Sequence, residues 1–159
     1  MLSRIFPVRI DNAFRGHRLA LWLFTLILLQ KLALSLTHLF RADGGAQSGS
    51  RMPLDSYPDG AAQNIVGLMA RMGLEQFLLA SFMVLALVRY RAMIPLMYLV
   101  VVVQYLMARG VTQMKPLARA GPSGVATMAL IVASLAVIGL VLSVTGRGYR
   151  DHASTGAGA

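Results

Sequence analysis

Four long apolar segments dominate the hydrophobic pattern of the chain, at residues 19–40, 64–88, 92–108 and 124–145. A helix rises 1.5 Å per residue, so the first segment reaches about 33 Å and can cross a hydrocarbon core of about 30 Å. Short connections make successive helices antiparallel neighbours. The pattern therefore predicts an all-α, polytopic membrane protein, an antiparallel bundle of four transmembrane helices.

The connections between these segments differ in length and composition. Residues 41–63 form the one long loop, rich in Gly, Ser, Asp and Pro, and we expect it on the outer side. Only the basic residues 89–91 separate the second and third segments, which predicts a tight helical hairpin. In the fourth segment, small residues recur at Ala129 and Ala133 and again at Gly139 and Ser143. Such spacing favours close helix approach, within the bundle or across a homo-oligomer.

The two ends of the chain are polar. Residues 1–18 are predicted to be a basic cytoplasmic leader, lying on the membrane surface or free as a positive tail, with Asp11 as the N-cap of a short helix. Residues 146–159 are rich in Gly and Ala and are predicted to be a disordered tail.

The distribution of Lys and Arg outside the segments predicts the orientation. With the N-terminus inside, eight such residues lie on the inner side and five on the outer side. The inner set is Arg4, Arg9, Arg15, Arg18, Arg89, Arg91, Arg147 and Arg150; the outer set is Arg41, Arg51, Arg109, Lys115 and Arg119. We therefore expect both termini to be cytoplasmic.

Composition narrows the function classes. Of the 159 residues, 57% are hydrophobic and only 13% are charged, and the formal net charge is +9. Because the basic residues flank apolar segments, without the interleaved aromatic residues of a nucleic-acid surface, anionic lipid head groups are the expected partners. The absence of cysteine excludes thiolate catalysis, disulfides and Cys-ligated metals. No nucleophile elbow, phosphate-binding loop or dinucleotide fingerprint occurs, so the sequence predicts no enzyme, no cofactor and no metal site.

Three segments of the sequence carry a resemblance. DNAFRGHRLAL, RMPLDSYPDGAAQNIVGLMARMGLEQFLLA and VRYRAMIPLMYL are similar to those of small, uncharacterised bacterial inner-membrane proteins with four helices and no known activity. The resemblance covers residues 11 to 115 and implies a bacterial inner-membrane setting. At the level of hydropathy alone, the layout is also similar to DoxX-like four-helix proteins.

Charged residues inside a membrane segment are costly, and they tend to face the bundle interior in pairs. Lys31, Arg71 and Glu75 are such residues, at depths of about 13, 10 and 16 Å from the outer ends of their segments at 1.5 Å per residue. Gln104 and Ser134 lie at about 8 and 15 Å. Their matching depths predict a polar cluster of these five residues in the outer half of the bundle, with Lys31 paired to Glu75.

Two functions are compatible with this predicted cluster. In the first, a buried Lys31–Glu75 ion pair only fixes the register of the helices, and the chain is a non-enzymatic structural or accessory subunit of a larger membrane assembly. In the second, two cations against one anion leave a net positive charge that binds an anionic amphiphile, or Lys31 exchanges a proton, as in a small transporter. A third outcome is that Lys31 extends toward the interface instead.

Overall fold

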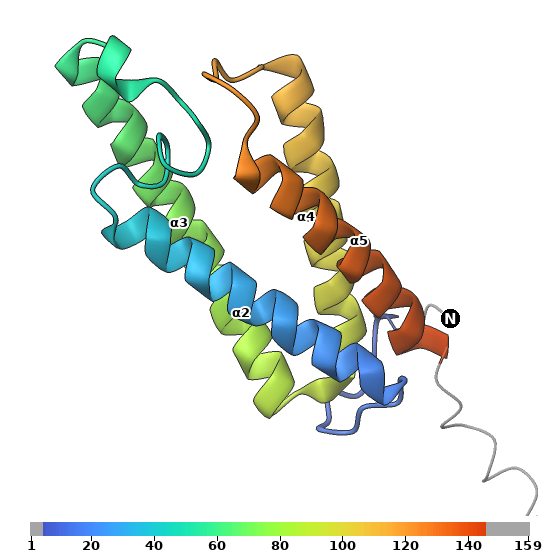
Figure 1. Ribbon diagram of the computed structural model, residues 1–159. Helices are drawn as coiled ribbons and strands as arrows, with labels where there is room; N and C mark the ends of the chain where they lie inside the picture. The colour runs from blue at the N-terminus through green and yellow to red at the C-terminus, as the bar shows by residue number, and fades with distance from the viewer. Residues whose placement is uncertain (1–4, 146–159) are drawn as a thin grey trace, which may run out of the picture.

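The computed structural model describes residues 5–145, and in that range every regular element is a helix (Figure 1). Four of these helices are long and apolar enough to cross a membrane, which confirms the predicted all-helical fold and the number of segments. The elements are α2 (Arg18–Phe40), η1 (Leu54–Ser56), α3 (Asp59–Val88), η2 (Arg91–Met93), α4 (Ile94–Met114) and α5 (Gly124–Thr145). The predicted tail at residues 146–159 lies outside the described residues.

Helix bounds follow the hydrophobic pattern at some ends and exceed it at others. α2 and α5 agree with the predicted segments to within one residue. α3 begins at Asp59 rather than residue 64, directly after Pro58, and α4 ends at Met114 rather than residue 108, shortly before Pro116. Hydrophobicity marks the part of a helix that fits the hydrocarbon, whereas proline marks where the backbone can be helical. The long loop is correspondingly shorter than predicted.

α2 is the central helix of the bundle: it packs against α3 on one side and against α5 on another. α4 packs against α5, but α3 and α4 touch little. They meet at the η2 turn and diverge from there, as Figure 1 shows. α3 and α4 therefore form a V, and α2 faces both of these helices.

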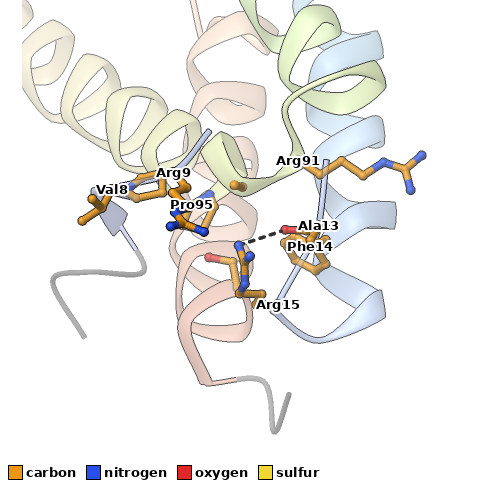
Figure 2. A pocket seen from close by; sticks show the side chains of 10 residues that line it. Val8, Arg9, Ala13, Phe14, Arg15, Arg91 and Pro95 are labelled. Carbon is orange, nitrogen blue, oxygen red and sulfur yellow. Dashed lines mark hydrogen bonds between the residues drawn. The ribbon is translucent and has the colours of Figure 1, made fainter. Parts of the chain in front are cut away.

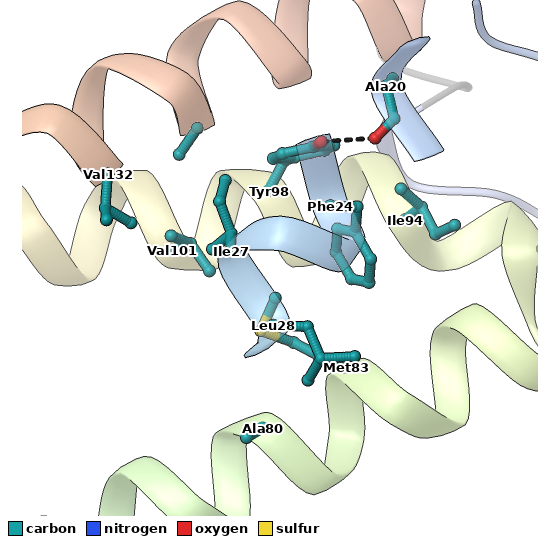
Figure 3. Close-up of a cluster of buried hydrophobic side chains, with 11 residues drawn as sticks. Ala20, Phe24, Ile27, Leu28, Ala80, Met83, Ile94, Tyr98, Val101 and Val132 are labelled. Carbon is teal, nitrogen blue, oxygen red and sulfur yellow. Dashed lines mark hydrogen bonds between the residues drawn. The ribbon is translucent and has the colours of Figure 1, made fainter. Parts of the chain in front are cut away.

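The apolar core lies between all four long helices, with Ala80 and Met83 contributed by α3 (Figure 3). Tyr98 is fully buried, and its ring packs edge-on against Phe24 with centroids 5.3 Å apart. Its hydroxyl donates a hydrogen bond of 2.6 Å to the carbonyl of Ala20. A Cβ at Gly139 would lie only 2.3 Å from the Tyr98 ring, so this glycine admits the ring against α5. Buried Tyr is stable here because its polar end has a partner.

The small residues of α5 contribute to this packing in part as predicted. Gly139 and Ser143 are buried, together with Ala136 and Val132. The other predicted small residues, Ala129 and Ala133, are only half-buried, and the buried positions lie mainly in the C-terminal half of α5.

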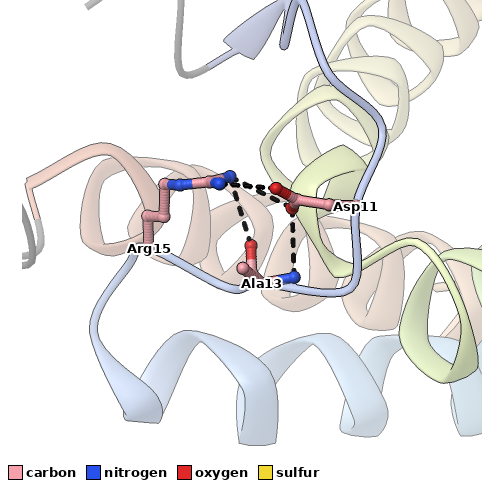
Figure 4. Close-up of polar contacts among 3 residues, drawn as sticks. All are labelled: Asp11, Ala13 and Arg15. Carbon is pink, nitrogen blue, oxygen red and sulfur yellow. Dashed lines mark hydrogen bonds and ion pairs between the residues drawn. The ribbon is translucent and has the colours of Figure 1, made fainter.

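The described part of the leader, residues 5–17, packs against the end of the bundle at which α2 begins. We call this the inner end and the opposite one the outer end, after the orientation that the sequence predicts. His17 begins α2 as its N-cap: its Nδ1 accepts from the Leu19 N–H at 3.2 Å, and its own N–H donates to the Leu142 carbonyl at 3.0 Å. The prediction of Asp11 as an N-cap is wrong. Asp11 instead accepts from Arg15 at 2.6 Å and from the Ala13 N–H at 3.1 Å (Figure 4). The Arg15 hydrogen bond, with that of Ala13, lowers the pKa of Asp11.

The outer loop is folded rather than open. Ala46, Met52 and Leu54 form a small second core against Met69 of α3. Burial by itself raises the pKa of Asp43, but hydrogen bonds from Ser48 and from the Gly45 N–H outweigh it and lower the pKa to about 2. The Ala120 N–H donates to the Arg51 carbonyl at 2.8 Å, so the loop also contacts the connection between α4 and α5.

Candidate functional site

One buried charge is enclosed by three helices. Lys31 of α2 is only 1% exposed. Its Nζ donates hydrogen bonds to Oε1 of Gln76 on α3, at 3.0 Å, and to Oε1 of Gln104 on α4, at 2.7 Å. The same ammonium lies 5.0 Å from the centre of the Tyr105 ring, within the range of a cation–π interaction. We refer to Lys31, Gln76, Gln104 and Tyr105 as the Lys31 cluster.

The spacing of buried residues on α2 explains why Lys31 faces inward. Phe24, Ile27 and Leu28 precede it, and Ser35 and His38 follow it, all buried at intervals of three or four residues. Residues at these intervals lie on one side of a helix. The apolar part of this stripe holds α2 in the core and thereby places Lys31 between α3 and α4, at a distance from the η2 turn.

Close contact between α2 and α3 brings Gln76 within reach. Gly73 is buried, and a Cβ there would lie 2.7 Å from the Cβ of His38 and 3.1 Å from the Ser35 carbonyl. The missing side chain lets the two backbones approach, as small residues do in membrane helix pairs. Gln76, one helical turn further along α3, then meets Lys31 at the same depth.

The structure brings together only part of the predicted cluster. The contact of Lys31 with Gln104 agrees with the prediction. The predicted Lys31–Glu75 ion pair is wrong: the side chains of Glu75 and Arg71 are 71% and 78% exposed, and they face each other at 3.9 Å on the outside of α3. Ser134 is also exposed and donates to the Leu130 carbonyl of its own helix.

The physical reason for this error is the helical rotation. Depth along the axis changes by 1.5 Å per residue, whereas direction changes by 100° per residue. Glu75 and Gln76 therefore lie at nearly the same depth but point to different sides of α3. A signal for the correct choice is present in the sequence. Gly73 and Ala80 are small residues three and four positions from Gln76, and all three lie on the side that faces α2.

The Lys31 cluster is a neutral cage around a cation. Among the described residues, no carboxylate lies within 4.0 Å of Lys31, and its partners are two amide oxygens and an aromatic ring. Two of the three N–H groups of the ammonium donate to these amide oxygens, and the ring adds a cation–π contact. The arrangement can connect three helices through one ammonium group.

Two cavities lie away from this cluster, at opposite ends of the bundle. The inner cavity, of about 680 Å³, is lined by leader residues, by Arg91, Ala92 and Pro95, and by Ser143 (Figure 2). The outer cavity, of about 520 Å³, is lined by loop residues and the start of α3, including Asp43, Asp55 and Asp59. No residue of the Lys31 cluster lines either cavity.

The inner cavity is cationic. Arg9, Arg15 and Arg91 line it together with the apolar side chains of Val8 and Phe14. Asp11 pairs with Arg15, whereas among the described residues no carboxylate lies within 4.0 Å of Arg9 or Arg91. In Figure 2 the Arg91 side chain extends away from Arg15, and its Nε donates to the Leu87 carbonyl at 3.0 Å.

These features define a helical bundle of the multi-pass membrane class, with one buried cation inside it and a basic cavity at one end. Within residues 5–145, no group of three or more His, Cys, Asp or Glu side chains is placed to hold a metal ion. No family model, no curated protein and no solved structure matches the chain.

Proposed function

We propose that the protein is a non-enzymatic structural or accessory subunit of a bacterial inner membrane, with both termini in the cytoplasm. The observation that supports this function is the complete enclosure of Lys31, whose ammonium is bonded to α3 and α4 and is 1% exposed. A transport or binding site needs a path for its cargo, whereas Lys31 is buried and lines neither of the two cavities described above. The cluster instead joins the diverging helices α3 and α4 through α2.

The test of this function replaces Lys31 and its two amide partners by apolar residues of similar size. The triple variant Lys31→Met, Gln76→Leu, Gln104→Leu leaves neither a buried ammonium without acceptors nor an amide without its donor, so the bundle is expected to stay folded. If the cluster is structural, this variant restores growth or membrane integrity to a strain in which deletion of the gene impairs them. A folded triple variant that fails to restore the phenotype overturns the proposal and makes Lys31 a working residue.

The orientation is tested separately. A phosphatase fused within the outer loop, near Ser48, is expected to be active, and a phosphatase fused to the C-terminus is expected to be inactive, because the enzyme folds only outside the cytoplasm. The reverse activities would place the leader and the inner cavity on the outer side.

A second function, the binding of an anionic amphiphile, is favoured by one observation, the inner cavity. Arg9 and Arg91, which have no carboxylate within 4.0 Å among residues 5–145, line it beside the apolar Val8 and Phe14. Guanidinium groups recognise phosphate well, and the cavity lies at the helix ends, where head groups are found. This places the proposed ligand site at the leader rather than at Lys31.

Mass spectrometry of the protein purified in mild detergent tests this second function. The wild-type chain is expected to retain anionic phospholipid, and the variant Arg9→Gln, Arg91→Gln is expected to lose it. Arg119→Gln, which removes an exposed arginine outside the cavity, is the matched control. Equal retention by all three proteins would exclude the cavity as the lipid site.

A further inference from the structure

Arg71 and Glu75 belong to a continuous stripe along the outside of α3. Positions 64, 68, 71, 75, 78, 82 and 85 follow one another at alternating steps of four and three residues, and all are exposed. The stripe consists of Asn64, Leu68, Arg71, Glu75, Leu78, Phe82 and Leu85. Alternating steps of four and three are the pattern of a helix surface that packs along a second helix. We call this set the α3 stripe.

The α3 stripe points away from the rest of the bundle. At 100° per residue, Phe82 lies about 180° around the helix from Gly73 and about 160° from Ala80, the residues that pack on the α2 side. Leu68 is 66% and Phe82 is 60% exposed. Beside the stripe, a Cβ at Gly67 would meet no atom within 4 Å, so no described part of this chain covers this side.

The two charges lie deep in the membrane. At 1.5 Å per residue, Glu75 is about 24 Å from Asp59 and about 20 Å from Val88, the two ends of α3. An exposed Arg–Glu pair at this depth would face lipid acyl chains, and at 3.9 Å it is held only loosely within one helix. Ionised groups at this depth are found in contact with other protein groups, not with lipid.

We propose that the α3 stripe is the contact surface between two copies of this chain, related by a twofold axis along the membrane normal. The two charges indicate that the partner is a second copy of the same chain. A cation and an anion lie one turn apart on the stripe, so when two identical stripes face each other, each charge can meet the opposite charge of the other copy. In parallel helices, Arg71 reaches Glu75 of the partner subunit, and the reciprocal pair forms at the same time. Leu68, Leu78 and Phe82 pack above and below these pairs. The contact is independent of the Lys31 cluster, which lies on another side of α3.

The experiment is disulfide cross-linking of single-cysteine variants in native membranes, which is direct because the chain contains no cysteine. Phe82→Cys places a thiol on the α3 stripe, and Val84→Cys is the matched control, exposed and at similar depth but on another side of the helix. Mild oxidation is expected to join Phe82→Cys into a species of twice the 17.1 kDa chain mass, on the order of ten times more than Val84→Cys, since a disulfide needs Cα atoms within about 7 Å. Equal yields from the two variants, or a product joined to a different protein, overturns the proposal.

A charge exchange tests the pairing itself in the Phe82→Cys background. Arg71→Glu places like charges against each other across the axis and is expected to lower the dimer yield on the order of ten-fold. Adding Glu75→Arg reverses both charges, restores the complement and is expected to recover the yield. Yields that do not respond to Arg71→Glu, or that Glu75→Arg fails to recover, show that the two charges do not pair across copies.

Discussion

The two sides of α3 use polar residues in opposite ways. On the side that faces α2, the polar residue is neutral: Gln76 accepts from the buried Lys31, next to the close backbone contact at Gly73. On the α3 stripe the polar residues are charged, and Arg71 and Glu75 meet no other described part of the chain. At one depth, α3 thus has an internal polar contact with α2 and, on its opposite side, a charged pair that contacts no other described helix.

The difference shows how a membrane bundle distinguishes internal from external contacts. A single lysine enclosed by amides needs no outside partner, because two amide oxygens and an aromatic ring within the chain stabilise its charge. An exposed Arg–Glu pair does need one, because the membrane interior offers it no water. The internal contact should therefore respond to substitution as a loss of folding, and the external contact as a loss of association. Four predictions separate the two, from the largest effect to the smallest.

The largest effect is expected when the buried cation loses both acceptors. Gln76→Leu with Gln104→Leu leaves Lys31 in an apolar site without an oxygen partner, and we expect the free energy of unfolding to fall by about 3–5 kcal/mol. Equilibrium unfolding in mixed micelles measures it. Adding Lys31→Met to the double variant is the control, because it removes the stranded charge and is expected to recover most of the loss. If the triple variant is as unstable as the double one, the effect comes from packing and not from the charge.

The close contact beside the cluster gives the second effect. Gly73→Ala places a methyl group 2.7 Å from the His38 Cβ, so α2 and α3 must move apart, and we expect a loss of about 1–3 kcal/mol. Because the separation also lengthens the bond from Lys31 to Gln76, the loss should be smaller in the triple apolar variant. An equal loss in both backgrounds would show that the helix contact and the Lys31 cluster are independent.

The number of helices and the position of Lys31 can be predicted from the sequence. The rotation of each helix about its axis cannot. The apolar segments predict four helices, and residues 19–40 and 124–145 match α2 and α5 closely. The inward direction of Lys31 follows from its spacing with Ser35 and His38. The distance of each residue along its helix from the outer end correctly predicts that Lys31 lies at the level of residues 75 and 76 of α3.

Rotation about each helix axis is what the sequence leaves open. In a soluble helix, apolar residues mark the inner side, but in a membrane helix both lipid and core are apolar, so hydrophobicity does not point inward. The prediction assigned the charged Arg71 and Glu75 to the interior by the general rule for intramembrane charges. In this chain the interior side of α3 is marked by small residues, Gly73 and Ala80, and the polar residue aligned with them is Gln76. Small residues are thus the better guide to the inner side here.

The third prediction uses the other glycine of α3. Gly67 has open space where its Cβ would be, so Gly67→Ala adds no clash and removes backbone freedom from the unfolded chain. In dilute detergent, where copies are separated, we expect a gain of about 0.5–1 kcal/mol in the free energy of unfolding. This gain contrasts with the loss at Gly73, six residues along the same helix. A loss at Gly67 would show that another part of the chain covers this side.

The smallest effect on folding is expected at the charges of the α3 stripe. Arg71→Gln with Glu75→Gln removes an exposed pair 3.9 Å apart, and such pairs at four-residue spacing contribute only about 0.3–0.5 kcal/mol. The separated monomer should therefore unfold as the wild type does, within about 0.5 kcal/mol. The same variant in the Phe82→Cys background should yield less cross-linked dimer in membranes, because neutral amides replace the charge pairs between copies. A monomer destabilised by more than about 1 kcal/mol would mean that both charges stabilise the fold itself, since contacts of that size arise only where side chains are well packed or desolvated. The distinction between the two sides of α3 would then fail, because its outer side would also be an internal contact.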